Sequence, residues 1–334
     1  MPAAGRIAPP VTLRAIAGAC GVSLRLAAAV LNDERSASIR VSDATRARVC
    51  AAAARLGYRP NRTARNIQRG RHGALGLLIG DVTFIRPQEL QLMIEAAQQR
   101  DCLLVIEHAN TPGALPKLVR EDCVDGLLLF QTMDCTLCRA IRRARVPLVQ
   151  INTNMRCGTG CITYDEEAGI AQAVRLLARR RRRQPALLVG ARTPPHYSDC
   201  VRPRALRRAA CAAGMAAPCV ARANDAAQAY AATAELLRRH PAIDALIVHA
   251  DCLAPGVWRA AADAGRAIPR DLSVLSFYGT AFAAAQAPPL TTLQIEPARL
   301  VQQAFAQLDA LAGRRRAAGR GAVLPYTLIA GGSV

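Results

Sequence analysis

The first 57 residues contain three short segments in which apolar side chains recur at the spacing of a helix. In the first segment these side chains are Leu13, Ile16, Ala17 and Cys20. Thr12 is suited to cap this helix, and Gly21 is suited to end it. Ser23 can cap the second segment, LRLAAAVLN, after a turn of only three residues. Two short helices joined this tightly predict a helix-turn-helix.

The third segment, DATRARVCAAAARL, follows a cap at Ser42 and stops at Gly57. Val49, Ala53 and Leu56 give this segment an apolar stripe. The stripe can close a core of three helices, so we expect a small helical domain at this end of the chain.

A basic segment, YRPNRTARNIQRGRHG, follows these helices. Asn61 can cap one short helix in it, which would end at Gly70. Isolated helices shorter than about 12 to 15 residues are marginal in water. We therefore expect this helix to become ordered only on a partner.

From Ala74 onward, short apolar runs alternate with helical stretches. The runs are LGLLIG, CLLVIE, DGLLLF, PLVQI, ALLVG, ALIVH, SVLSF and TTLQI. Helices are expected near residues 87–100, 166–180, 202–213, 254–264 and 297–311. Continuous apolar runs are typical of strands buried on both faces, so the pattern predicts parallel sheets covered by helices and an α/β fold. The segment between Asn110 and Val124 is short, and we expect a stunted helix there.

Composition narrows the class of protein. An apolar fraction of 51% excludes a disordered chain. The longest apolar run falls far short of the roughly 18 to 20 residues that span a bilayer, and no secretory signal is visible. We expect a cytoplasmic protein with no membrane partner, in which the 12 Cys are mostly reduced.

Positive charge is concentrated near the N-terminus. The formal net charge is +20, and all but one of the basic residues are Arg. Residues 1–72 carry 13 Arg against Asp33, Glu34 and Asp43, a net charge of +10. A small basic head on a more neutral body predicts a nucleic-acid-binding domain. The alternative is a basic face that is only solvated.

Four pieces of the first 65 residues occur in an order and spacing that are specific to one family. They are VTLRAIAGACGVS, AVLN, RVSDATRARV and LGYRPNRTAR. Together they resemble the lactose/galactose repressor (LacI-type) family of bacterial transcription regulators. The likeness continues in VDGLLLF, VPLVQINT, ITYDEEAGIAQAVRLLARR, IPRDLSVLSF and PPLTTLQIEP.

The resemblance implies a small all-α helix-turn-helix head followed by a two-lobed, periplasmic-binding-protein-like body with parallel sheets. The implied limits are residues 1–60 for the DNA-binding domain, 61–73 for a hinge helix and linker, and 74–334 for an effector-binding and dimerisation domain. The implied partners are double-stranded DNA with a palindromic operator, a second copy of the chain, and a small-molecule effector between the lobes. The implied function is a sequence-specific transcriptional regulator that the effector controls, with a repressor favoured over an activator.

In the family, the second helix enters the major groove and the hinge helix enters the minor groove, where an apolar side chain wedges between base pairs. By matching position the wedge here is Ile67, with Ala64 beside it. The alternative for Ile67 is ordinary packing against the body. The candidate DNA-binding residues are Thr12, Ser23, Leu24, Arg25, Ala28, Ala29, Asn32, Asn61, Arg62, Ala64 and Ile67.

The recognition helix departs from the family pattern. Its polar stretch is replaced by Leu26, Ala27, Ala28 and Ala29. Alanine cannot form the bidentate hydrogen bonds that read base edges, although its methyl can touch a thymine methyl. Arg25 is left to read a guanine, or alternatively to touch only phosphate. This weakness favours a rival hypothesis: an effector-binding sensor that has weak or lost operator specificity.

Ligands of such sheets bind beyond the carboxyl ends of the strands. That rule indicates Asp81 to Phe84, Glu107 to Asn110, Gln131, Asn152, His249 to Asp251 and Tyr278. By resemblance, Arg202 matches the Arg of an R-x-x-G-[FY] motif and Asp251 matches the Asp of an A-N-D motif. The candidate effector-binding residues are Phe84, Gln131, Asn152, Arg202, His249, Asp251 and Tyr278.

Two positions of the effector site depart from the family. Ala250 stands where an Asn is usual, and Tyr278 stands where an Asp is usual. The missing carboxylate removes an acceptor of sugar hydroxyls, which puts a sugar effector in doubt. The alternatives are an anionic or aromatic ligand held by Arg202, and no effector at all.

An enzyme is not expected. The chain shows no dinucleotide or phosphate-loop glycines, no nucleophile elbow and no HExxH. His108, His196 and His249 are isolated, and an isolated histidine is more often structural than catalytic. No catalytic residue, cofactor or metal ion is therefore assigned.

Four cysteines follow two successive apolar runs. They are Cys135, Cys138, Cys157 and Cys161. At one edge of a parallel sheet they could form a zinc site or a redox pair. The favoured alternative is that they are ordinary small apolar residues, because Cys is used throughout the chain.

Overall fold

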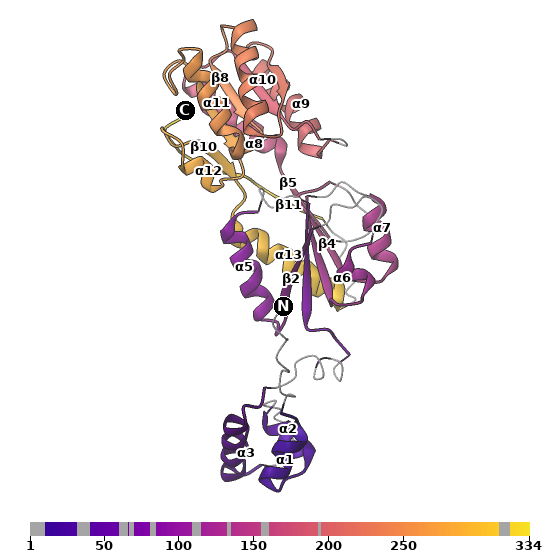
Figure 1. Ribbon diagram of the computed structural model, residues 1–334. Helices are drawn as coiled ribbons and strands as arrows, with labels where there is room; N and C mark the ends of the chain where they lie inside the picture. Colours follow the sequence, from indigo (N-terminus) through magenta and orange to yellow (C-terminus); the bar gives the residue numbers. More distant parts are fainter. Residues whose placement is uncertain are drawn as a thin grey trace, which may run out of the picture. The chain divides into compact units, whose positions relative to one another are not determined.

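The computed structural model describes residues 11–31, 41–59, 66, 70–80, 85–108, 115–131, 135–154, 160–192, 195–313 and 321–334. The chain divides into two compact units, Met1–Arg71 and His72–Val334 (Figure 1). The described part of the first unit is helical, and the second unit is α/β. Both agree with the pattern of apolar positions.

The first unit contains the predicted helix-turn-helix. Its helices are α1 (Leu13–Cys20), α2 (Leu24–Leu31) and α3 (Asp43–Leu56). Thr12 Oγ1 caps α1 by accepting a hydrogen bond from Ala15 N, and Gly21 ends α1 in the left-handed conformation with a φ of 59°. The axes of α1 and α2 meet at 109°, which is within the range of helix-turn-helix motifs.

The three helices share one small core. Its buried members are Ile16, Cys20, Val30, Val49, Ala52 and Ala53. The stripe expected on α3 was wrong in one position, because Leu56 is 38% exposed and Ala52 is buried in its place. Leu56 is the last residue of α3, and its side chain is exposed to solvent at the end of the helix.

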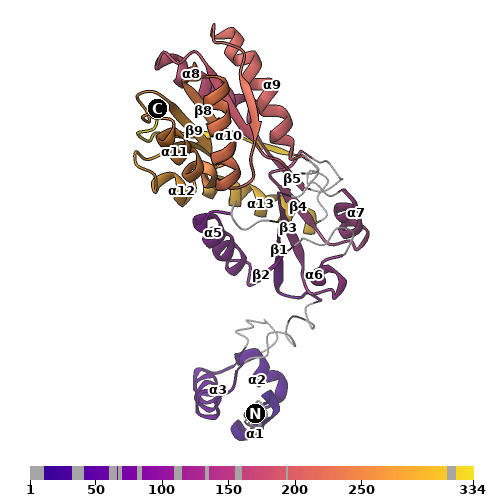
Figure 2. The same ribbon diagram turned by 45° about the horizontal axis from the view of Figure 1, so that its top comes forward.

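The second unit has two lobes, each built on a six-stranded sheet (Figure 2). The sheet of lobe 1 is parallel throughout, in the order β11-β5-β4-β3-β1-β2. Its strands are β1 (Ala74–Ile79), β2 (Leu103–His108), β3 (Gly126–Phe130), β4 (Leu148–Ile151), β5 (Gly160–Tyr164) and β11 (Ala322–Leu324). Its helices are α5 (Pro87–Gln98), α6 (Lys117–Arg120), α7 (Cys135–Arg143) and α13 (Pro297–Ala312). The four residues of α6 are the stunted helix that the sequence predicts.

The sheet of lobe 2 has the order β12-β10-β9-β8-β6-β7, in which only β12 is antiparallel to its neighbour. Its strands are β6 (Pro185–Val189), β7 (Cys219–Arg222), β8 (Ala245–Val248), β9 (Ser273–Phe277), β10 (Thr291–Gln294) and β12 (Thr327–Ile329). Its helical segments are α8 (Glu166–Arg179), α9 (Tyr197–Ala212), α10 (Ala226–Arg239), η2 (Asp251–Leu253), α11 (Ala254–Asp263) and α12 (Ala281–Ala284).

The chain passes between the lobes three times. It leaves lobe 1 after β5, returns between β10 and α13, and leaves again between β11 and β12. Each lobe is therefore assembled from segments that are far apart in the sequence. Parallel strands whose carboxyl ends face the other lobe place the loops of both sheets around one region.

Several elements were not predicted from the sequence. The edge strand β7 has alternating exposure, and α10 is rich in alanine, so neither carries a strong apolar signal. Helix α9 begins at Tyr197, five residues before the expected start. Its cap is His196, which forms a capping box with Asp199 and is not among the usual capping residues.

No single helix among the described residues is long and apolar enough to cross a membrane. Helices α1 and α2 would together suffice in length and composition, but they are bent by 109°.

Candidate DNA-binding and effector sites

The exposed surface of α2 begins at its N-terminus. Leu24 is 47% exposed, Arg25 is exposed and Ala28 is partly exposed. Ser23 Oγ accepts a hydrogen bond from Leu26 N at 3.2 Å and so caps the helix. Leu24, Arg25 and Ala28 thus form the surface of α2 that could meet a groove.

Ala29 does not belong to that surface. It is 4% exposed, as is its neighbour Val30 in the core of the head. Burial leaves little of the Ala29 side chain open to a DNA groove, so the structure gives no support to the prediction that Ala29 contacts DNA. Ala27 is buried as well, so two of the three alanines of the recognition helix serve the core and not the groove.

The hinge segment is largely outside the described residues. Five of the predicted DNA-binding residues lie outside the described residues: Asn32, Asn61, Arg62, Ala64 and Ile67. Asn66 is described, and it is helical and buried.

Three of the predicted effector residues share an unusual backbone conformation. Gln131 follows β3 with a φ of 55°, Asn152 follows β4 with a φ of 57°, and Tyr278 follows β9 with a φ of 94°. A side chain other than glycine is strained at such angles, at a typical cost of about 1 to 3 kcal/mol, and such strain is concentrated at functional sites. Phe84, the remaining candidate of lobe 1, lies outside the described residues.

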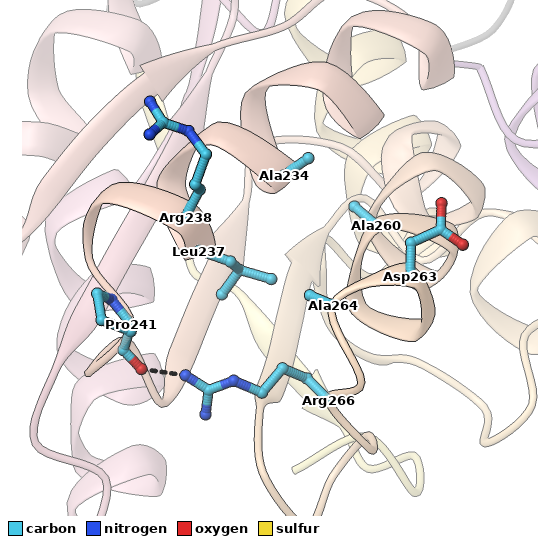
Figure 3. Close-up of a pocket in the computed structure, with 8 residues that line it drawn as sticks. All are labelled: Ala234, Leu237, Arg238, Pro241, Ala260, Asp263, Ala264 and Arg266. Carbon is cyan, nitrogen blue, oxygen red and sulfur yellow. Dashed lines mark hydrogen bonds between the residues drawn. The ribbon is translucent and has the colours of Figure 1, made fainter.

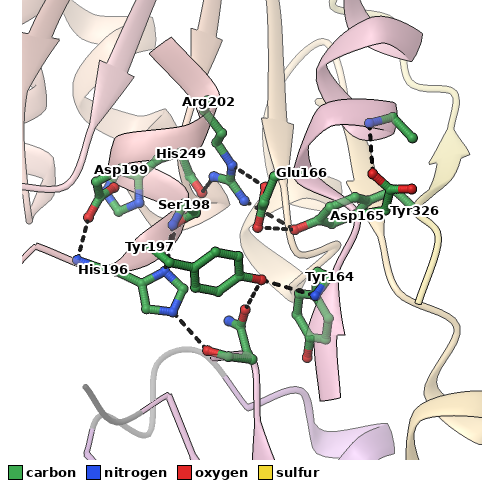
Figure 4. A network of polar contacts seen from close by, with 12 residues as sticks. Tyr164, Asp165, Glu166, His196, Tyr197, Ser198, Asp199, Arg202, His249 and Tyr326 are labelled. Carbon is green, nitrogen blue, oxygen red and sulfur yellow. Dashed lines mark hydrogen bonds and ion pairs between the residues drawn. The ribbon is translucent and has the colours of Figure 1, made fainter. Parts of the chain in front are cut away.

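Arg202 is the centre of a buried polar network (Figure 4). Its Nε donates to Glu166 Oε2 at 2.6 Å and its Nη1 donates to the His249 carbonyl at 3.0 Å. Its Nη2 donates to Tyr326 Oη at 3.1 Å, and Tyr326 in turn donates to Glu166 Oε1 at 3.0 Å. The guanidinium carbon lies 3.5 Å from the centre of the Phe277 ring.

These contacts change the role of Arg202. Its exposed fraction is 0%, and the Glu166 carboxylate balances its charge. Burial opposes the charge, but Glu166 and its hydrogen bond keep the pKa of Arg202 well above the usual value. The structure therefore gives Arg202 a partner within lobe 2 at the place where the sequence suggested an anionic ligand.

The Asp251 carboxylate is also hydrogen-bonded within the protein. Its Oδ1 accepts hydrogen bonds from Ser276 Oγ and from Thr292 Oγ1, the latter at 2.8 Å. Its Oδ2 accepts from Thr280 N at 2.5 Å. Burial raises the pKa of this carboxyl, and the three donors oppose the shift. Asp251 thus fastens the ends of β9 and β10 to the loop after β8.

His249 is buried beside the same network. Its Nε2 lies 3.0 Å from the Ala223 carbonyl, and its own carbonyl accepts from Arg202. Both interactions stay inside lobe 2. His249, like Asp251, supports the loops of the site from behind.

The residues that join the lobes here were not predicted from the sequence. Tyr197 Oη donates to Asn152 Oδ1 at 3.1 Å, and His196 Nε2 lies 2.8 Å from the Asn152 carbonyl. Tyr164 N donates to Tyr197 Oη at 3.0 Å. A helix cap before Tyr197 would have indicated the start of α9 in the sequence. The cap is a histidine, His196, which is not a usual capping residue, so the start was not predicted.

A surface pocket of about 310 Å³ lies elsewhere, between α10 and α11 of lobe 2 (Figure 3). Its lining residues are Ala234, Leu237, Arg238, Pro241, Ala260, Asp263, Ala264 and Arg266. Arg266 donates to the Pro241 carbonyl, and Asp263 accepts from Tyr230 Oη at 2.9 Å. The charged groups of this pocket are thus engaged with the protein, and none of the predicted effector residues lines it.

The cysteine set shows no metal site in the part of the chain that the structure describes. Cys138 is buried and accepts from Gln150 Nε2 at 3.0 Å, while Cys161 Sγ donates to the Thr153 carbonyl at 3.3 Å. Cys135 is exposed, and Cys157 lies outside the described residues. The described members behave as ordinary helix and strand residues.

Known proteins share both parts of this architecture. A model described as bacterial regulatory proteins, lacI family, matches residues 12–61, and one described as a periplasmic binding protein-like domain matches residues 174–334. An uncharacterized HTH-type transcriptional regulator from the aml 5′ region of Streptomyces limosus is 30% identical over 304 residues, 84% of this chain and 82% of that protein. The chain belongs to the lacI family.

Other members of the lacI family match this chain over nearly its whole length. The lactose operon repressor of Escherichia coli strain K12 is 26% identical over 335 residues, 96% of this chain and 89% of that protein. A crystal structure of the lac repressor dimer bound to operator and the anti-inducer ONPF has the same fold, with a TM-score of 0.82 at 24% identity, covering 97% of this chain and 99% of that chain. These lacI-family relatives are transcriptional regulators, and this chain shares their helix-turn-helix and their two-lobed body.

The two buried histidines of this lacI-family body predict a dependence of stability on pH. Burial lowers the pKa of His196 and of His249 from 6.5 to about 4. Between these values the unfolded chain binds more protons than the folded chain, so acidification must lower the free energy of unfolding. The expected slope is up to about 1.4 kcal/mol per pH unit for each histidine.

Urea unfolding between pH 6.5 and 5, followed by the fluorescence of the single Trp258, measures this slope. His196→Asn should reduce it, whereas the same change at the exposed His240 should leave it as it is. A slope that is insensitive to His196→Asn would exclude this histidine as its source.

Proposed function

We propose that this lacI-family chain is a homodimeric, sequence-specific repressor that binds a palindromic operator in double-stranded DNA. The observation that carries the proposal is the geometry of the head: α1 and α2 meet at 109°, and Leu24 and Arg25 are exposed at the N-terminus of α2. In helix-turn-helix proteins the N-terminal residues of the second helix contact base edges. A regulator of this kind acts in the cytoplasm and is not an enzyme, in keeping with the relatives described above.

A small-molecule effector is proposed to bind between the lobes. Gln131, Asn152 and Tyr278 support this site, because each follows a strand at its carboxyl end and holds a strained backbone. Arg202 and Asp251 act in this proposal as buried supports of the loops, since their polar atoms are bound within the lobe. In this proposal the effector contacts Asn152 and Tyr278 directly. The charge of Arg202 does not select an anionic effector, because Glu166 already balances it.

Selection of bound sequences from random duplex DNA tests the proposed function. A dimer places two recognition helices in major grooves about one helical turn or a multiple of it apart, so the selected sites should be palindromic. Because few side chains of α2 can form hydrogen bonds with base edges, few base pairs in each half-site should be strongly preferred. Recovery of no preferred sequence would favour the rival hypothesis, a sensor of the same architecture without operator specificity.

Arg25→Ala should weaken binding to the selected site by about 1 to 3 kcal/mol per half-site and relax the preference at one base pair. The reason is that Arg25 is the exposed residue of α2 with donors that fit guanine O6 and N7. Affinity for the selected site and for random DNA should be measured by fluorescence anisotropy.

The matched control is Arg55→Ala, which removes an exposed Arg from the last turn of α3. It should reduce affinity for both DNAs by similar, smaller factors. If Arg25→Ala also affects both DNAs equally, Arg25 contacts phosphate and does not read sequence.

A further inference from the structure

The first turn of α9 connects the two lobes of the body. Helix α9 packs with α8 and β6 in lobe 2, whereas Asn152 and Tyr164 stand at the ends of β4 and β5 in lobe 1. Tyr197 Oη donates to Asn152 Oδ1 and accepts from Tyr164 N, and His196 Nε2 meets the Asn152 carbonyl. Three hydrogen bonds therefore cross between the lobes at one place (Figure 4).

The direction of the histidine hydrogen bond follows from its other nitrogen. Ser198 N donates to His196 Nδ1 at 3.4 Å, which makes Nδ1 an acceptor. In a neutral imidazole the proton then resides on Nε2. His196 Nε2 accordingly donates to the Asn152 carbonyl at 2.8 Å.

Both ends of this connection are fixed in their own lobes. On the side of lobe 2, Asp199 accepts from His196 N at 3.2 Å and from Gly190 N at 2.8 Å, which holds the start of α9 against the end of β6. On the side of lobe 1, Asn152 N donates to the Ile162 carbonyl at 2.8 Å. The connection therefore joins two rigid sheets and not two loose loops.

Water has little access to these hydrogen bonds. Less than a tenth of each of the four bridging residues is exposed: His196, Tyr197, Asn152 and Tyr164. A buried hydrogen bond whose partner is lost leaves an unsatisfied polar group, and that penalty favours keeping the bond formed. Separation of the lobes at this point would expose several such groups together.

The same contacts occupy a residue of the proposed effector site. Both oxygens of Asn152 accept a hydrogen bond from the start of α9, which fills one of the two acceptor positions on each oxygen. A ligand that donates to these oxygens therefore competes with the first turn of α9 for them. The chain thus supplies at Asn152 the donors that a bound ligand would otherwise supply.

We propose that His196 and Tyr197 form an interlobe latch, an internal substitute for a ligand that holds the two lobes together in the unliganded protein. With the latch, hydrogen bonds within the chain set the arrangement of the lobes, and no ligand is needed for it. An effector that binds at Asn152 acts by opening the latch. This last consequence rests on the proposed function, whereas the latch does not.

The test compares the ligand-free full chain with Tyr197→Phe, which removes only the hydroxyl. The Tyr164 amide should exchange with deuterium about tenfold faster, because it loses its acceptor. Small-angle scattering should give a larger radius of gyration for the variant. Tyr230→Phe is the control, since the Tyr230 hydroxyl bonds Asp263 within lobe 2, and it should change neither value.

Asn152→Gly is a second variant, which removes the side-chain oxygen that accepts from Tyr197 Oη and keeps the backbone carbonyl that His196 Nε2 contacts. Glycine accepts the φ of 57° at this position without strain, so the backbone is expected to keep its conformation. A larger radius of gyration in Tyr197→Phe or in Asn152→Gly supports the latch. Folded variants with the wild-type radius of gyration overturn it, even where the Tyr164 amide exchanges faster, because the bond would then be merely local.

Failure of the latch and failure of the proposed function are distinguishable in this experiment. Operator binding is measured separately on the wild-type chain. If the wild-type chain selects no DNA sequence, the proposed function fails while the scattering comparison still decides the latch.

Discussion

A chain reduced to residues 72–334 should lose operator binding by at least about a thousandfold while its body remains folded. The expected loss is the smallest typical ratio between specific and non-specific DNA affinity. The physical reason is that the helix-turn-helix and a net charge of +10 both lie in residues 1–71, outside the separate unit His72–Val334. Anisotropy titrations at physiological salt measure the affinity, and Trp258 fluorescence reports on the fold of the body.

The full chain is the control for this truncation. Its affinity should fall steeply with salt, with a log-log slope of about −0.9 for each phosphate that is neutralised. The truncated chain should show no measurable binding under the same conditions. Retention of DNA by the truncated chain would place a second DNA-binding surface on the body and contradict the assignment of the head.

Arg202→Ala should lower the free energy of unfolding of the body by about 3 to 5 kcal/mol. The substitution leaves the Glu166 carboxylate buried without its cation, and removal of one partner of a buried ion pair typically costs this amount. It also removes the donors to His249 and Tyr326. Such a loss would give Arg202 a structural role beside the effector-binding role that the sequence suggests.

Urea unfolding monitored by Trp258 measures the loss. The control is the double variant Arg202→Met with Glu166→Gln, which removes both charges and should cost less than the sum of the two single changes. A loss below about 1 kcal/mol for Arg202→Ala would show that Glu166 finds another partner or is protonated, and the paired description would fail.

The fold could largely be predicted because its signals are local. Thr12, Ser42 and Gly57 mark helix ends by their own conformational preferences, and the structure places α1 and α3 at these boundaries. Continuous apolar runs marked the buried central strands in the same way. The edge strand β7 and the alanine-rich α10 escaped, because burial of one face leaves a weak pattern over so few residues.

The site was only partly predictable, for a different reason. Position at the end of a strand, a property of the local sequence, made Gln131, Asn152 and Tyr278 candidates, and the structure gives all three a positive φ. Which polar atoms are free to meet a ligand depends on distant partners. Arg202 meets Tyr326 across 124 positions of sequence, and Tyr197 meets Asn152 across 45. No local pattern carries such pairings.

The three passages between the lobes also set the order in which the body can be completed during synthesis. Helix α13 supplies the buried Leu300, Phe305 and Leu308 to lobe 1, yet it follows the whole of lobe 2 except β12. About 130 residues separate the end of β5 from α13. At roughly 5 to 20 residues per second, the growing chain presents the apolar surface that α13 later covers for on the order of ten seconds. Lobe 1 therefore stays incomplete on the ribosome until lobe 2 has been synthesised and α13 has emerged.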